Sequence, residues 1–171
     1  MAAQFGIANE KNGWNYSDKI GRIRNDWALN AAIAHGGFGN RPEDSMYHQR
    51  NLDEQGRPLT GERSYRLTFP AGQLPPVGAF WSITAYDQKS LDLMENPIHR
   101  YSLGDRTPGL RRGSDGSLTI AIQASEPADP GLKANWLPVG PGAFYLILRS
   151  CEPDPQMATG EWAAPPVTTV P

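Results

Sequence analysis

The chain has 171 residues, a formal net charge of −2 and a single cysteine. This length suits one domain with a sizeable core, and the lack of a basic run or stripe argues against nucleic acid as a partner. One cysteine excludes an internal disulfide, and no segment approaches the ~20 apolar residues of a transmembrane helix, so no membrane partner is expected.

The N-terminal region predicts an arm followed by a helix. Residues 1–16, the arm, have neither the basic start nor the apolar run of a signal peptide, so we expect a cytoplasmic chain as written. Residues 17–171 are expected to form a single β-sandwich domain. Its first element is an amphipathic helix over about 18–35, because apolar residues recur there at spacings of three and four and Gly36-Gly37 follows as a C-cap.

Strand patterns dominate the rest of the chain. Alternating apolar and polar residues between turn signals predict strands at 46–50, 63–69, 79–87, 91–95, 117–123 and 143–151. The 18 Gly and 16 Pro indicate tight turns between them. We therefore predict an all-β fold, an antiparallel, jelly-roll-like β-sandwich with the helix packed on it. The last strand is apolar on both faces, so we expect the helix to cover its outer face.

One loop holds the best candidate for a functional site. Asn96-Pro97 breaks the strand before it, because Pro lacks an N–H and restrains the preceding residue, and His99, Arg100 and Tyr101 follow at once. Arg100 would hold an anionic or carbonyl-bearing ligand. Tyr101, Tyr86 or His99 would act as a general acid or base. The alternative is that Arg100 pairs with an acid and Tyr101 packs against the body.

Metal and cofactor motifs are missing from the sequence. His35, His48 and His99 show no metal-ligand spacing, and no segment matches a calcium loop. The sequence also lacks a P-loop, a dinucleotide-binding glycine motif and a nucleophile elbow. We therefore expect neither a metal site nor a cofactor.

A series of motifs resembles a known bacterial family, the domain of unknown function 1214, over about residues 19–170. The motifs are GRPLTGERSYRLTFPAGQLPPVGAFWSITAYD, NPIHRYSLGDR, DGSLTIAIQ, NWLP and GEWAAPPV. The resemblance implies a β-sandwich but no activity. It also implies that longer members carry a preceding domain of unknown function 1254 and often an export signal, so this chain is expected to be a stand-alone or truncated member. Ala85 and Cys151 depart from the family pattern.

The resemblance also singles out individual residues. Pro97 and Asp115 are expected to shape turns, and Trp81 and Trp136 to fill the core or to supply an apolar wall to a site. Fewer structural reasons are apparent for the other candidate ligand-binding positions. These are Asn96, Asp105 and Asn135, beside Arg100 and Tyr101.

The sequence is compatible with three functions. The first is a small-molecule-binding β-sandwich, with or without cofactor-free catalysis, whose ligand-binding residues would be Asn96, Asp105, Trp81, Asn135 and Trp136. The second is a structural subunit, such as a homo-oligomer, that lacks its usual partner domain. The third is a non-catalytic carbohydrate-binding module, which would need exposed rings in a row. Trp14, Trp136 and Trp162 are the candidates for that row.

Overall fold

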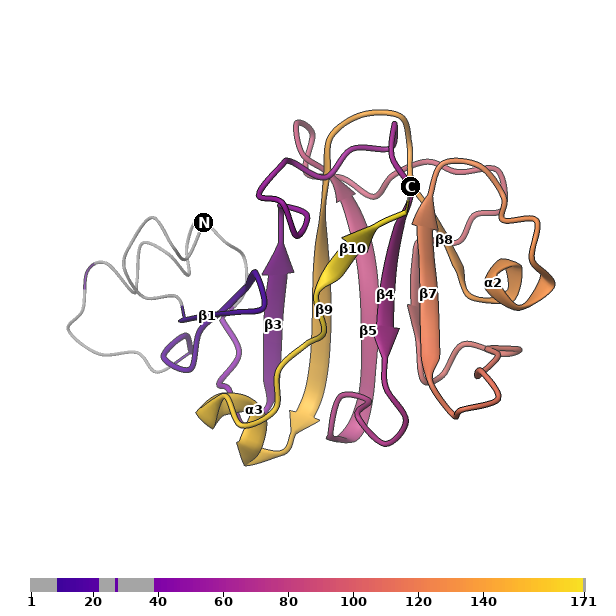
Figure 1. The fold of residues 1–171 in the computed structure, drawn as a ribbon. Coiled ribbons are helices and arrows are strands. Elements are labelled where there is room, and N and C mark those ends of the chain that lie inside the picture. Colours follow the sequence, from indigo (N-terminus) through magenta and orange to yellow (C-terminus); the bar gives the residue numbers. More distant parts are fainter. Residues whose placement is uncertain (1–8, 22–26, 28–38, 171) are drawn as a thin grey trace.

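The structure, a computed structural model, describes residues 9–21, 27 and 39–170. Strands in this part of the chain form two sheets that face each other (Figure 1). One sheet has six strands in the order β1-β2-β3-β9-β5-β6, and the other has four in the order β10-β4-β7-β8. All neighbouring strands are antiparallel except β7 and β8, which run parallel.

The strands are short except in the middle of the larger sheet. That sheet contains β1 (Asn9–Lys11), β2 (Trp14–Tyr16), β3 (Ser45–Arg50), β9 (Phe144–Pro153), β5 (Val77–Asp87) and β6 (Ser102–Gly104). The smaller sheet contains β10 (Val167–Thr169), β4 (Tyr65–Phe69), β7 (Leu118–Gln123) and β8 (Trp136–Pro138). The predicted all-β class is confirmed, while the jelly-roll path and the division at residue 16 stay predictions.

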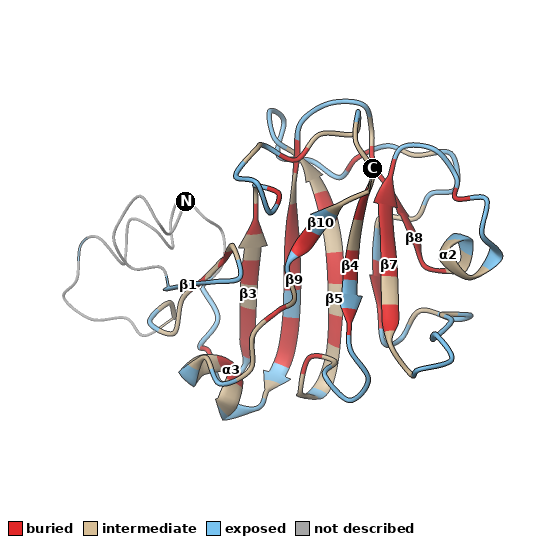
Figure 2. Cartoon of the chain, in the orientation of Figure 1, coloured by how far each residue is buried: buried red, intermediate tan, exposed pale blue. Residues whose placement is uncertain are grey.

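The core lies between the two sheets, and alternation along each strand decides which residues fill it. In the larger sheet, Trp81, Ile83 and Ala85 of β5 face inward beside Ser150, Leu148 and Leu146 of β9. In the smaller sheet the inward residues are Tyr65, Leu67 and Phe69 of β4 and their partners on β7. Figure 2 shows the resulting buried stripes along β9 and β7.

The inward side of β3 is closed by the C-terminal segment. This segment contains the short helix α3 (Pro155–Thr159) and then Trp162. Met157 of α3 packs with Tyr16 and Met46, with Trp162 beside them. The N-terminal and C-terminal parts of the described chain therefore meet over β3.

Two short helices were not predicted. α2 (Pro130–Ala134) and α3 each begin with an Asp N-cap followed by Pro, and in each the Asp carboxylate accepts a backbone N–H from the first turn. Because each helix has only five residues, it is too short for an apolar periodicity that would predict it. The predicted strand at 91–95 is reduced to a single bridge between Tyr86 and Leu93. Most of the predicted helix at 18–35 lies outside the described residues.

Candidate functional site

The predicted Asn96–Tyr101 loop is held by Asn96. The side-chain oxygen of Asn96 accepts the Arg100 backbone N–H at 2.9 Å, and its amide donates to the carbonyls of Arg100 at 3.1 Å and Met94 at 3.2 Å. Asn favours such turns because its side chain imitates a backbone group. All of these bonds are internal, so the Asn96 amide acts as a turn residue.

Arg100 connects this loop to the smaller sheet. Its Nη1 donates to the carbonyls of Trp136 at 3.0 Å, Ala134 at 3.2 Å and Lys133 at 3.4 Å. The last two residues belong to the C-terminal end of α2, where a cation satisfies otherwise free carbonyls. The guanidinium therefore binds backbone oxygens, whereas the sequence pointed either to a ligand or to a carboxylate.

Asn135 and Trp136 are both buried and bonded to the backbone. The Asn135 amide donates to the carbonyls of Arg111 at 2.6 Å and Thr119 at 3.0 Å, and its oxygen accepts the Arg111 N–H at 2.8 Å. The indole N–H of Trp136 donates to the Gln123 carbonyl at 2.8 Å. Buried polar groups need such partners. Both residues thereby hold β8 and the segment at Arg111 to β7.

Trp81 and Asp105 also have structural contacts. Trp81 is 2% exposed and lies 5.3 Å from the Phe69 ring, between ring centroids. Asp105 accepts the Trp81 backbone N–H at 3.1 Å, close to where the register of β5 against β9 shifts between Val77 and Phe80. The proposed apolar wall is thus part of the core between the sheets.

His99 and Tyr101 do come together on the surface. The Tyr101 hydroxyl donates to Glu95 at 3.2 Å and lies 3.5 Å from His99 Nδ1. Partial desolvation, and then the negative charge of Glu95, raise the pKa of the Tyr101 phenol. His99 has φ of 50°, in the left-handed region that non-glycine residues seldom adopt. Tyr86 is not in this chain of contacts, because its ring stacks on Tyr145.

The outward face of the larger sheet carries a second arrangement of aromatic rings. Tyr86 of β5 and Tyr145 of β9 are cross-strand partners whose rings stack at 5.4 Å between centroids and 17° between planes. Burial, and then the neighbouring Tyr86, raise the pKa of Tyr145. Leu93, bridged to Tyr86, is 44% exposed. We call the outward positions of β3, β9, β5 and β6 the outward face.

Arg149 lies in the middle of the outward face. Its guanidinium carbon is 5.6 Å from the centroid of the Phe80 ring and 5.8 Å from that of Tyr47, and the guanidinium carbon of Arg106 lies 4.4 Å from the Phe80 centroid. Arg149 itself is exposed. No carboxylate within the described residues forms an ion pair with it. Such cation–π pairs contribute about 0.5–1 kcal/mol at exposed sites and leave the N–H donors in the guanidinium plane available.

The composition of the outward face is unusual for a solvated sheet. Its members come from four strands and include aromatic, hydroxyl, amide and arginine side chains but no carboxylate. They are Ser45, Tyr47, Gln49, Tyr145, Ile147, Arg149, Cys151, Phe80, Ser82, Thr84, Tyr86, Ser102 and Gly104. The alternation of β5 predicted part of this set, but Arg149 over two rings depends on cross-strand pairing that one sequence does not reveal.

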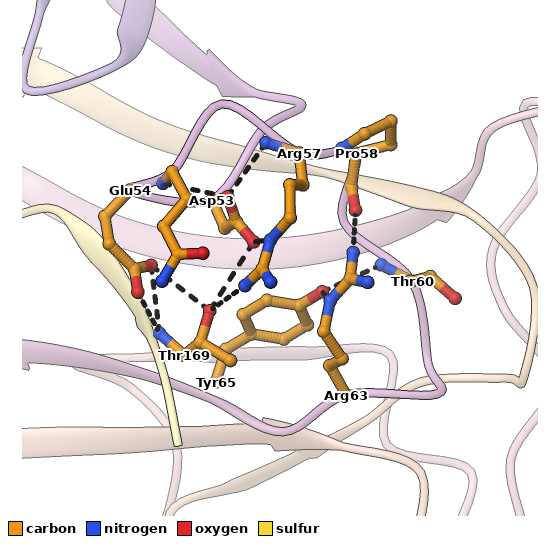
Figure 3. Close-up of polar contacts among 9 residues, drawn as sticks. Asp53, Glu54, Arg57, Pro58, Thr60, Arg63, Tyr65 and Thr169 are labelled. Atoms are coloured by element: carbon orange, nitrogen blue, oxygen red, sulfur yellow. Dashed lines mark hydrogen bonds and ion pairs between the residues drawn. The ribbon is translucent and has the colours of Figure 1, made fainter. Parts of the chain in front are cut away.

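A closed polar cluster lies at one end of the sandwich (Figure 3). The Asp53 carboxylate has no exposed area, and it accepts the backbone N–H groups of Gln55 and Arg57, each at 2.9 Å, and Arg57 Nε at 2.8 Å. Arg57 also donates to the Thr169 hydroxyl at 3.3 Å, and Glu54 accepts the Thr169 N–H at 3.0 Å. The cluster thereby fastens the C-terminal strand β10 to the loop after β3.

The electrostatics of Asp53 follow from these contacts. Burial works to raise the pKa of its carboxyl, but the hydrogen bonds from Arg57 and Gln55 and the Arg57 charge outweigh it and hold the pKa below its usual value. Beside this group, the buried Tyr65 hydroxyl accepts the Thr60 N–H at 3.0 Å and Arg63 Nε at 3.1 Å. These groups are satisfied by one another, which leaves the cluster little capacity for a ligand.

Other features restrict the possible functions. Within residues 9–21, 27 and 39–170, no group of three His, Cys, Asp or Glu side chains is arranged to hold a metal ion. None of the helices described is long and apolar enough to cross a membrane. Trp14 and Trp136 are buried and Trp162 is half-buried with its indole N–H on the Gln73 carbonyl, so these three rings form no exposed row for a sugar.

Comparisons with known proteins agree with the fold and add no activity. The family model described as protein of unknown function (DUF1214) matches residues 44–155. The crystal structure of the VPA0106 protein from Vibrio parahaemolyticus matches with a TM-score of 0.71 and 31% identity, over 84% of this chain and 35% of that one. A putative uncharacterized protein from Burkholderia cenocepacia matches with a TM-score of 0.42 and 17% identity, over 77% of this chain and 30% of that one.

The matches to individual proteins are limited to solved structures and to part of their length. No curated protein matches the sequence significantly. The chain spans only about a third of the length of the two solved proteins it matches.

Proposed function

The chain belongs to the DUF1214 family, and on that premise we propose that its sandwich is an interaction module that docks through the outward face onto a second protein surface. The observation that carries the proposal is Arg149, an exposed guanidinium that lies over Tyr47 and Phe80 and forms no ion pair within the described residues. Arg and Tyr are the residue types that most often dominate binding at protein interfaces.

The mixture of side chains supports docking over ordinary solvation. Interface cores are depleted of Lys, Asp and Glu and enriched in aromatic residues and Arg. The outward face matches this pattern, with Tyr86 stacked on Tyr145 and with Arg149 over Tyr47 and Phe80. Both described helices lie elsewhere, since α2 contacts β7 and α3 packs through Met157 on the inward side of β3.

Charge complementarity favours a different protein over a second copy of this chain. If two copies paired through this face, Arg149 and Arg106 of both copies would share one interface, with no carboxylate at the outward strand positions to offset them. Like charges opposed across an interface cost several kcal/mol. A surface that carries carboxylates instead gains charge-assisted hydrogen bonds from the in-plane N–H donors of Arg149.

The size of the solved relative gives further support. In the Vibrio parahaemolyticus protein, the match accounts for 35% of the chain, so most of that protein lies outside the shared sandwich. A covering surface in such a protein can come from its own additional chain. In the crystal structure of that relative, we expect the positions equivalent to Tyr145 and Arg149 to be buried by residues outside the match.

A photo-crosslinking experiment tests the proposal directly. A photoreactive amino acid replaces Tyr145 on the outward face or, as the control, Thr68 on the exposed side of the smaller sheet. We expect irradiation in cells to attach the Tyr145 position, but not the Thr68 position, to one discrete protein of a different sequence. Adducts only between copies of this chain, or no adducts at all, would contradict the proposal.

A second candidate is a small-molecule site at His99, Tyr101 and Glu95. The specific observation is the hydrogen-bonded series from Glu95 to Tyr101, with His99 Nδ1 3.5 Å from the phenol on an exposed loop. Tyr101→Phe removes only the hydroxyl, so it leaves the fold intact. A ligand among sugars, organic acids, nucleotides, alcohols and aldehydes that raises the Tm of the wild type but not of Tyr101→Phe would support this site. Equal shifts in both proteins would exclude the Tyr101 hydroxyl from the binding.

A further inference from the structure

Three buried polar atoms on the inward side of the larger sheet have no partner within the described residues, and two of them are neighbours in the strand register. These two are Nδ1 of His48, which is 2% exposed, and Oγ of Ser150, which is 0% exposed. A buried polar atom without a hydrogen bond is costly, so native proteins pair nearly all of them with protein or with ordered water. The third atom is Nε of Arg50, on the same strand as His48, which is also buried without a hydrogen-bond partner.

The strand register places these two atoms on one face of the sheet. Ser150 of β9 pairs with Met46 of β3, and His48 of β3 pairs with Leu148 of β9, so Ser150 and His48 are diagonal neighbours. Side chains at diagonal positions start about 7 Å apart, which is too far for a direct contact without side-chain reach and suits one molecule between them. The His48 ring meets Trp162, and Ser150 pairs with Met46, which packs with Met157 on the same side of the sheet.

The imidazole ring is fixed in this compartment. It stacks on Tyr16 at 4.9 Å between centroids and meets the edge of Trp162 at 6.0 Å. Burial lowers the pKa of His48 to about 4, so the ring is neutral near pH 7 and Nδ1 either donates or accepts according to its tautomer. The Ser150 hydroxyl can also do either, so the two groups can adapt to the same hydrogen-bonding molecule.

We propose that the structure contains an internal binding site for one ordered water molecule, which bridges His48 Nδ1 and Ser150 Oγ beneath the C-terminal segment. A water needs two to four polar partners to remain in an otherwise apolar interior, and this site offers two unpaired groups at neighbouring positions. The bridge would add a side-chain connection between the paired strands β3 and β9. It is independent of the docking proposed for the opposite, outward face.

The sign of one stability change tests the proposal. If water bridges the two groups, Ser150→Ala removes one of its partners, and we expect Tm to fall by about 2–4 °C, the size of one lost hydrogen bond in a domain of this length. If the hydroxyl is an unpaired buried group, the same substitution removes a cost, and Tm stays equal or rises. Ser45→Ala is the matched control, since that buried hydroxyl has a partner in the Ser150 carbonyl at 3.3 Å.

A double mutant and a crystal structure complete the test. In a His48→Phe background, the effect of Ser150→Ala should shrink toward zero, because the bridge is already lost. A high-resolution crystal structure should show density for one water within hydrogen-bond distance of both groups. An unchanged or raised Tm for Ser150→Ala, full additivity with His48→Phe, or a direct contact without intervening density would each overturn the proposal. Should His48→Phe fail to fold, the Ser150→Ala sign and the density decide the matter.

Discussion

Two regions of this molecule use arginine beside an aromatic ring in opposite ways. In the closed cluster, Arg57 lies on the buried carboxylate of Asp53 and donates to Thr169, and nearby Arg63 donates to the Tyr65 hydroxyl. On the outward face, Arg149 lies over two rings and has no carboxylate partner within the described residues. The first region satisfies its charges within the chain, and the second presents donors and rings outward.

The difference indicates how polar groups divide between stability and binding. A group whose partners are already in place contributes to the folded state, and its loss leaves the remaining partners unpaired. A group with free donors contributes little to folding, because an exposed charge keeps its water. Mutation of the closed cluster should therefore change stability, while mutation of the outward face should change association.

The largest expected effect is the pH dependence of stability set by His48. Its pKa is about 4 in the folded protein and near 6.5 when unfolded, so between these values the unfolded chain binds the extra proton. The contribution of His48 to the free energy of unfolding is then fully present above pH 6.5. It falls as pH drops to 4, by about 3 kcal/mol over the window. The ring contacts Tyr16 and Trp162, and Arg50 and Ser150 occupy neighbouring inward positions of the sheet.

Urea unfolding as a function of pH measures this contribution. His48→Phe should flatten the curve between pH 4 and 6.5, and His99→Phe is the matched control because His99 is exposed. An unchanged slope in His48→Phe would mean that other groups cause the acid sensitivity. The outward strand positions carry no carboxylate or histidine, so they should add nothing to the slope of unfolding free energy against pH between 4 and 6.5.

Asp53→Ala should destabilise the closed cluster by about 2–3 kcal/mol. The change leaves two backbone N–H groups and Arg57 without their acceptor, although Arg57 is 42% exposed and can turn to water, which limits the loss. The midpoint of urea unfolding measures the effect. Glu54→Ala, the adjacent exposed carboxylate, serves as the control and should cost less. Equal midpoints for Asp53→Ala and wild type would break the proposed contrast between the regions.

Arg100→Ala should reduce stability by about 1–2 kcal/mol, with no loss of ligand affinity. The guanidinium satisfies three backbone carbonyls at and just beyond the C-terminal end of α2, so its removal loosens the Asn96–Tyr101 loop from the smaller sheet. Chemical unfolding gives the stability, and thermal shift against the compound set named above gives the binding. A still-folded Arg100→Ala that loses a ligand bound by the wild type would restore Arg100 as a binding residue.

The sequence predicted the fold better than the site, and the reasons are physical. Alternation reports burial directly, so the predicted strands at 79–87 and 143–151 lie close to the observed β5 and β9. The short helices α2 and α3 bury little and were marked only by Asp-Pro. A side chain's role depends on what pairs with it across the fold. Asn96 and Arg100 looked like ligand groups until their backbone partners were visible.

Arg149→Glu has the smallest expected effect on stability and the largest on association. The side chain is exposed and its ring contacts are weak, so the free energy of unfolding should change by less than about 0.5 kcal/mol. Binding to a carboxylate-bearing partner should fall strongly, because the substitution replaces an attraction with a repulsion. Arg112→Glu, an exposed charge reversal away from the outward face, is the control and should retain the partner.

The two measurements together separate the occupants of the outward face. Arg149→Glu that folds normally but loses the crosslinked partner supports docking of another protein. If Arg149→Glu instead lowers the Tm of the isolated chain by several degrees, a segment of this chain covers the face, and the helix predicted at 18–35 is the candidate. In that case the outward face would belong with the closed cluster, as a region that satisfies its own charges, and docking would have to be sought elsewhere.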